Sequence, residues 1–165
     1  MMELRKITFL DEQMPECIAL DIAPEQKKFL TTNAIWLAWA YELDSRGEVM
    51  ECRAVYVEGK MIGLISYNYF VNDVVYKETC YRIRPIMIDK NYLGKGYEKV
   101  AIEKLLEEIK TKPHGEAAAV FATYDPDEAE MAAIYKEVGF VLTDLTFYEE
   151  GPDVDDVILR MGIVT

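Results

Sequence analysis

The stretch IMIDKNYLGKGYEKVAIEKLLEEIK, Ile86–Lys110, decides the fold because it joins an apolar strand to an amphipathic helix through a glycine-rich turn. The apolar run stops at Asp89, and Gly94 and Gly96 then flank Lys95. Beyond the turn, apolar residues recur at helical spacing: Ala101, Ile102, Leu105, Leu106 and Ile109. A strand that leads directly into a helix is typical of α/β domains.

The glycine turn itself is suited to an anion. A helix N-terminus carries unpaired N–H groups and the positive end of the helix dipole, both of which attract phosphate. Glycine lets a ligand come close to the backbone, and Lys95 and Lys99 add positive charge. Many strand-to-helix turns carry glycines for geometry alone, and the Walker and dinucleotide-binding patterns are absent. Taken alone, the turn therefore predicts either a phosphate site or an ordinary tight connection.

The rest of the sequence predicts one α/β domain over residues 1–165 with a mixed, mostly antiparallel sheet. The expected strands are residues 4–10, the hairpin 53–70 with its turn at Glu58-Gly59, and residues 79–89, 117–124, 140–150 and 155–163. The expected helices are residues 14–22, 23–44 with Pro24 near the start, 96–110 and 125–140. Pro85 lies inside the strand 79–89, which predicts a bulge or a local splay there. A turn is expected at Gly151-Pro152.

The charge balance restricts the partners. The chain has 165 residues, 30 Asp plus Glu against 18 Lys plus Arg, and a formal net charge of −12. Such a surface repels nucleic acid and anionic membranes and favours cationic partners, so we expect neither of the former as a partner. The alternative is that the acidity serves only solubility.

Cysteine and histidine usage excludes several kinds of site. Cys17, Cys52 and Cys80 are far apart and form no CxxC pair, so neither a metal site nor a disulfide framework is predicted. The sequence shows no signal-peptide pattern and no apolar run of membrane-spanning length, and we expect a cytoplasmic protein. His114, the only histidine, lies in a predicted loop, so a Ser-His-Asp triad is not expected.

A second motif, AAIYKEVGF, lies in the predicted helix 125–140. Met131, Ile134, Tyr135 and Val138 fall at i, i+3, i+4 and i+7 and therefore form one apolar stripe. Read alone, the stripe predicts that Tyr135 is a core residue whose hydroxyl finds one partner.

Together the two motifs resemble the GNAT superfamily of N-acetyltransferases, and the resemblance covers nearly the whole chain. In that family the turn matches [Q/R]xxGx[G/A], which aligns with LGKGYE, residues 93–98, and a later helix carries a tyrosine shortly before a Gly-Phe pair, as Tyr135 does here. The segments CIALDIAPEQKKFLTTNAIWLAWAY and YRIRPIMIDKNYLGKGY are similar to the spermine/spermidine (diamine) acetyltransferases. The resemblance implies a GNAT-like fold with strands splayed at the cofactor site.

The resemblance also implies a cofactor site for acetyl-CoA, without metal. Backbone amides of the turn would hold its pyrophosphate: Leu93, Gly94, Lys95, Gly96, Tyr97, Glu98 and Lys99. The strand edge of Ile86, Met87 and Ile88 would pair with the pantetheine arm. Tyr135 would protonate the leaving thiolate. Glu128 stands where relatives have an asparagine that helps to hold the cofactor.

Three positions depart from the family pattern. Leu93 replaces Gln or Arg, and Glu98 replaces the final Gly or Ala. Glu98 and Glu128 both bring a carboxylate toward an anionic ligand, and an acid in the first turn of a helix is also an ordinary feature that the helix dipole favours. These departures leave a catalytically silent relative, which binds CoA weakly or acts as a ligand-sensing or interaction domain, as the alternative to an enzyme.

The expected acceptor is the primary amine of a small molecule, with a polyamine as one candidate. With no suitable histidine, the expected base is a carboxylate, directly or through a water, or else the backbone with ordered waters. Glu78, just before the strand 79–89, is the first candidate, followed by Asp73 and Glu42. The alternative is that Glu78 is a solvated surface charge. Four tyrosines would line a cation-binding pocket or simply be sheet residues: Tyr41, Tyr67, Tyr69 and Tyr81. The sequence is compatible with a homodimer.

Overall fold

The computed structural model describes residues 1–7, 13–147 and 155–163. The strands are β1 (Met2–Lys6), β2 (Val49–Val57), β3 (Lys60–Phe70), β4 (Cys80–Ile83), β5 (Met87–Ile88), β6 (Ala119–Tyr124), β7 (Val141–Leu142) and β8 (Val157–Gly162). The helices are α1 (Gln13–Ala19), α2 (Asn33–Ser45), α3 (Tyr97–Ile109) and α4 (Ala129–Val138), with short 3₁₀ segments η1 (Pro24–Gln26) and η2 (Lys90–Tyr92). None of the described helices is long and apolar enough to span a membrane.

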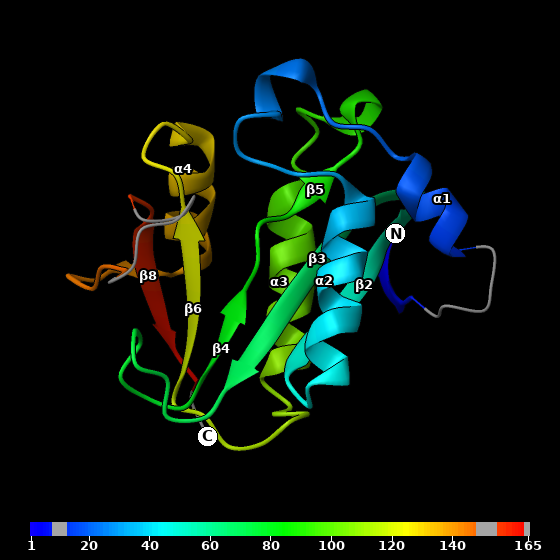
Figure 1. Ribbon diagram of the computed structural model, residues 1–165. Coiled ribbons are helices and arrows are strands. Elements are labelled where there is room, and N and C mark those ends of the chain that lie inside the picture. Colours follow the sequence, from blue (N-terminus) through cyan, green and yellow to red (C-terminus); the bar gives the residue numbers. More distant parts are fainter. Residues whose placement is uncertain (8–12, 148–154, 164–165) are drawn as a thin grey trace.

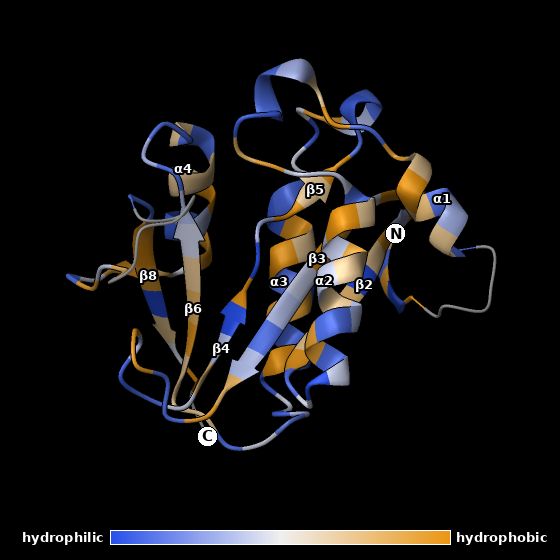
Figure 2. Cartoon of the chain, in the orientation of Figure 1, coloured by the Kyte–Doolittle hydropathy of each residue, from blue (hydrophilic) through white to orange (hydrophobic). Residues whose placement is uncertain are grey.

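The described strands form one mixed sheet, as predicted, in the order β1-β2-β3-β4-β6-β8-β7, with β5 paired to β3. All strand pairs are antiparallel except β4 with β6, which are parallel. Helix α2 covers one face of the sheet, and α3 and α4 cover the other (Figure 1). The apolar stripe of α3 faces the sheet (Figure 2), so the predicted amphipathic helix packs as its periodicity indicates.

The hairpin of β2 and β3 confirms the strongest local prediction. Its two turn residues, Glu58 and Gly59, have φ of 49° and 76°. Positive φ at both central positions is the signature of the type I′ turn, whose twist matches that of the flanking strands. The register shifts between Val55 and Tyr56, which pair with Gly63 and Met61, so the extra residue, Ile62, places a bulge in β3.

The predicted strand 79–89 is divided at Pro85, and this division opens the sheet. β4 pairs with both β3 and β6, but the β4–β6 ladder ends at Ile83 and Ala122. Pro85 has no N–H to donate to a ladder. After Pro85, β5 remains paired with β3, whereas the C-terminal end of β6 pairs only with β8. β5 and β6 therefore diverge in the shape of a V (Figure 1), and the splay expected at Pro85 is confirmed.

Two predicted elements, the helix 23–44 and the strand 140–150, differ markedly from the structure. Pro24 begins only the short η1, and α2 starts at Asn33, where Thr32 accepts a hydrogen bond from the amide of Ile35. A side-chain cap of this kind stabilises the start of a helix. Of the strand predicted over residues 140–150, the described part, residues 140–147, contains only the two-residue β7. Residues 8–10 of the first predicted strand and the predicted turn at Gly151-Pro152 lie outside the described residues.

Candidate active site

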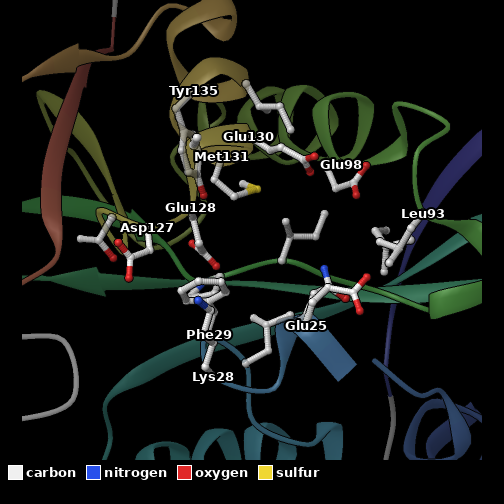
Figure 3. A pocket seen from close by; sticks show the side chains of 18 of the residues that line it. Glu25, Lys28, Phe29, Leu93, Glu98, Asp127, Glu128, Glu130, Met131 and Tyr135 are labelled. Carbon is white, nitrogen blue, oxygen red and sulfur yellow. The ribbon is translucent and has the colours of Figure 1, made fainter. Parts of the chain in front are cut away.

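A cleft of about 540 Å³ lies at the V between β5 and β6. One wall comes from the β5–α3 junction, a second from the start of α4, and the third from the segment between α1 and α2 (Figure 3). Seven of the residues expected in the site line this cleft: Ile86, Ile88, Leu93, Gly94, Glu98, Glu128 and Tyr135. The structure therefore brings together two motifs that lie about forty residues apart in the sequence.

The glycine turn presents open backbone to the cleft. Gly94 and Gly96 have φ of 74° and 77°, the left-handed region that favours glycine. A Cβ built on either residue would meet no atom within 4 Å. Gly96 is the N-cap of α3, and no side-chain hydrogen bond caps this helix start within the described part of the chain. The turn therefore offers unblocked amides and the positive end of a thirteen-residue helix to an anion.

The edge of β5 offers a further backbone donor. The amide of Asp89 donates to the carbonyl of Ile62 in β3 at 2.7 Å. Because successive amides of a strand point to opposite edges, the N–H of Ile88 points to the other edge, where no described strand pairs with β5. The side chain of Met87 lies on the α2 side, where the Asn33 amide donates to its sulfur at 3.4 Å. An extended ligand arm can therefore add to this edge in the manner of a strand.

Asp89 fixes the end of β5, a role that sequence reasoning missed. Its carboxylate is buried and accepts hydrogen bonds from the backbone amides of Asn91 at 3.0 Å and Asp21 at 2.9 Å. It thereby ties the segment after α1 to the junction that leads into the glycine turn. The only signal in the sequence was an acid placed directly after an apolar strand.

Tyr135 carries the most unusual polar group in the cleft. The residue is 1% exposed, and its hydroxyl has no hydrogen-bond partner among the described residues. Burial raises the pKa of Tyr135 well above its usual range, and the nearby Glu128 carboxylate adds to this effect while Arg82 opposes it. The prediction of a core residue with one partner is therefore half confirmed, because the ring is buried but the hydroxyl is left without its partner. Such a hydroxyl stays protonated and can donate a proton.

Glu128 lies at the N-terminus of α4 with its side chain directed into the cleft (Figure 3). Burial raises the pKa of Glu128 to about 7, and the neighbouring carboxylates of Asp125 and Asp156 contribute in the same direction. A hydrogen bond from the backbone of Asp125 acts against them. The carboxyl group is therefore poised to change its protonation state near neutral pH.

The cleft is acidic overall. Among the described residues that line it, the charged ones are one lysine, Lys28, and five acids, namely Glu25, Glu98, Asp127, Glu128 and Glu130. Lys95 and Lys99 of the glycine turn are not among the lining residues. The ammonium group of Lys95 lies 5.4 Å from the ring centre of Tyr92, and that of Lys99 lies 3.3 Å from the Glu137 carboxylate of α4. The cleft therefore attracts a cation more strongly than the sequence of the turn alone suggests.

Several other expected participants lie elsewhere. Glu78 does not line the cleft and forms an ion pair with Arg160 at 3.0 Å. The four tyrosines do not line it either: Tyr67 and Tyr81 are buried in the core, Tyr69 packs against that core, and Tyr41 is exposed. The described residues contain no group of three or more His, Cys, Asp or Glu side chains that could hold a metal ion.

The third wall was not predicted. It comes from η1 and the residues after it, and includes Glu25, Lys28 and Phe29. These residues carry no spacing or composition that marks a binding site, because the sequence pattern favoured a continuous helix through them. Their place opposite Glu128 depends on the chain path between α1 and α2.

Comparison with known proteins identifies the fold. The acetyltransferase (GNAT) family model matches residues 8–140. No curated protein is similar enough to count as a match. Among solved structures, an aminoglycoside acetyltransferase in complex with coenzyme A is 16% identical, with a TM-score of 0.70, and the match covers 98% of this chain and 95% of that one.

Two further solved structures have the same fold at a similar sequence identity. The spermidine N-acetyltransferase from Vibrio cholerae, in complex with CoA and spermine, is 16% identical with a TM-score of 0.66, over 98% of this chain and 95% of that one. The ribosomal-protein-S18-alanine N-acetyltransferase from Escherichia coli is 14% identical with a TM-score of 0.65, over 100% of this chain and 96% of that one. At such identities the likeness concerns the fold, whereas the family model spans most of the sequence. The chain belongs to the acetyltransferase (GNAT) family.

Proposed function

We propose that the protein is an acetyl-CoA-dependent N-acetyltransferase that acts on the primary amine of a small molecule, with polyamines as the leading acceptor class. The observation that carries the proposal is the arrangement along one cleft. Uncapped amides of the α3 turn lie at one end, the free edge of β5 runs along the side, and the Tyr135 hydroxyl lies at the other end.

The residues present fit the cofactor in three respects. The α3 turn offers main-chain donors to a diphosphate, and no Cβ at Gly94 or Gly96 hinders its approach. The N–H of Ile88 is placed to donate to an extended arm. Tyr135 can hold a proton for a departing thiolate because its pKa is raised. Bound acetyl-CoA would supply the activated acyl group for the reaction.

The acidic cleft supports a cationic acceptor. The described part of the lining has five carboxylates and one lysine, which favours an ammonium group, and polyamines carry several such groups. A thiol-release assay with acetyl-CoA tests this directly, using spermidine, spermine, an aminoglycoside and a peptide with an N-terminal alanine as acceptors. The expected result is turnover with at least one amine and faster turnover with spermidine or spermine. Turnover confined to the peptide would contradict the polyamine assignment.

Replacing Glu98 with glutamine is expected to tighten CoA binding about fivefold. The carboxylate lines the cleft beside Gly94 in the first turn of α3. Removing its repulsion of a diphosphate is worth about 1 kcal/mol at contact distance in a water-like medium, which corresponds to about fivefold in Kd. Titration calorimetry at low and high salt measures the change, which high salt should reduce.

The matched control for Glu98 is Glu103→Gln. Glu103 is an exposed acid of the same helix and does not line the cleft. Its replacement changes the net charge equally but should leave the Kd for CoA unchanged within about twofold. Equal tightening by both substitutions would show that net charge acts at a distance, and that the Glu98 side chain is not beside the diphosphate.

A second candidate function is a catalytically silent family member that binds CoA weakly or senses a ligand. The observation that favours it is the placement of Glu98 and Glu128 in the lining of the cleft. This candidate predicts measurable CoA binding without thiol release for any amine, whereas the enzyme predicts both.

A further inference from the structure

The acceptor amine needs a proton acceptor before it can react. An alkyl ammonium group has a pKa of about 10.4, so it is protonated at neutral pH and its nitrogen has no free lone pair. Glu78 lies outside the cleft in an ion pair with Arg160, and His114 does not line the cleft either. The base therefore has to come from the carboxylates of the cleft wall or from water.

Glu128 differs from the other carboxylates of the cleft in its burial. Asp127 and Glu130, its neighbours in the sequence, are exposed, whereas Glu128 is half-buried. The Glu128 side chain enters the cleft close to the side chain of Tyr135, which projects from a later turn of α4 (Figure 3). The Tyr135 hydroxyl is fully buried and has no partner among the described residues, so a polar ligand atom is needed there.

Among the described residues, the charged groups that act on the Glu128 carboxyl are both acidic. Asp125 precedes it in the β6–α4 connection and Asp156 precedes β8, and both carboxylates disfavour its ionised form. Across the cleft lie Glu25 and Lys28. A ligand ammonium group that enters this space would therefore meet a carboxylate whose charge is not already compensated by the wall of the cleft.

We propose that Glu128 is the general base of acetyl transfer and takes a proton from the acceptor ammonium at the Tyr135 end of the cleft. The inference rests on the proposed acetyl-transfer function and adds the residue that activates the nucleophile. Because the Glu128 carboxyl changes its protonation near pH 7, it can accept this proton and release it again at neutral pH.

The step balances without any further reagent. Glu128 takes one proton from the ammonium nitrogen, whose lone pair then forms the C–N bond to the acyl carbon. The C–S bond breaks, and Tyr135 gives its phenolic proton to the sulfur. The second proton on the nitrogen returns to the Tyr135 oxygen, and Glu128 releases its proton to water. The products are an amide, a thiol and one proton.

The substitution Glu128→Gln tests the role because it keeps the shape of the side chain and removes its basicity. We expect kcat/KM for the best acceptor of the panel to fall about 100-fold, while the Kd for CoA changes by less than about twofold. Glu103→Gln, which removes an exposed carboxylate outside the cleft, is the matched control and should keep the wild-type rate within about threefold. A large loss of CoA affinity in Glu128→Gln would instead make Glu128 a cofactor ligand and overturn the proposal.

The pH profile separates a base from a structural residue. In the wild type, kcat/KM should fall as the pH drops below about 7, because Glu128 then becomes protonated. Glu128→Gln should lose this inflection. Its defect should also shrink for a fluorinated alkyl amine that is already neutral at the assay pH, since that acceptor needs no base. An unchanged wild-type rate in Glu128→Gln would refute the proposal while leaving acetyl transfer itself established.

A readout that needs no acetyl transfer tests the burial of the carboxyl. The folded-state pKa of Glu128 lies above its unfolded value, so the folded protein holds a proton between about pH 4.5 and 7 that the unfolded chain has lost. Stability therefore decreases as the pH rises through this window. Glu128→Gln should have a higher Tm than the wild type above pH 7 and an equal one below pH 4.5. Equal Tm values at every pH would show that the carboxyl is solvated and would remove the basis of the proposal.

Discussion

Replacing Tyr135 with phenylalanine is expected to lower kcat for acetyl transfer about 100-fold and, at the same time, to stabilise the protein. The hydroxyl is buried without a described partner, and an unsatisfied buried polar group costs about 1–3 kcal/mol. Its retention in a fully buried position is explained if it donates a proton to the leaving sulfur, a role worth about 10²-fold or more in rate. Thiol-release kinetics and thermal unfolding measure the two effects.

The chain offers a matched control for this substitution. Tyr76 is also buried, at 4% exposure, and its hydroxyl likewise lacks a described partner, but it packs with Phe121 and Cys80 in a separate cluster away from the cleft. Tyr76→Phe should raise the Tm similarly and leave kcat unchanged. The Kd for CoA should stay within about twofold in both variants. A loss of CoA affinity in Tyr135→Phe as large as its loss of rate would assign Tyr135 to the structure of the cleft.

Replacing Gly63 with alanine is expected to destabilise the protein by about 1–3 kcal/mol and to impair acetyl-CoA binding. A Cβ at Gly63 would lie 2.3 Å from the backbone oxygen of Met87 and 2.8 Å from the side chain of Ile88. The backbone contact cannot be relieved by a side-chain rotation, so β5 has to move away from β3. That movement displaces the strand edge that is proposed to hold the cofactor arm. Denaturant unfolding and titration calorimetry with CoA measure the two losses.

Gly162→Ala is the control for Gly63→Ala. Gly162 ends β8, and a Cβ there would meet no atom within 4 Å. Its replacement should change the unfolding free energy by less than about 0.5 kcal/mol. If Gly63→Ala behaved like Gly162→Ala in both measurements, the close contact between β3 and β5 would not control the cofactor site.

Local patterns predicted much of the fold because their causes lie within a few residues. The turn at Glu58-Gly59 fixes the β2–β3 hairpin, and the apolar stripe of α3 fixes its packing face. The missing N–H of Pro85 predicted the splay between β5 and β6. The start of α2 at Asn33 was not predicted, because a cap by Thr32 competes with a proline signal and the sequence does not rank the two.

The chemistry of the site was harder to predict because it depends on contacts between distant residues. Glu78 pairs with Arg160, which lies 82 positions away. The protonation of Glu128 depends on burial and on Asp156 of a different element. The wall from Glu25 to Phe29 depends on a chain path that no repeat or motif encodes. The glycine turn was identifiable because a ligand that binds backbone amides demands glycine at fixed positions.

The central claim, that the cleft between β5 and β6 holds acetyl-CoA, is tested most directly by the change in Tm on adding the cofactor to the wild-type protein. Ligand at about 100 times its Kd adds about 2.7 kcal/mol to the folded state, which is roughly 5–10 °C for a chain of this size. The predicted result is a shift of that order with acetyl-CoA and CoA, and a smaller one with inorganic pyrophosphate alone. No shift with acetyl-CoA at millimolar concentration would contradict the account.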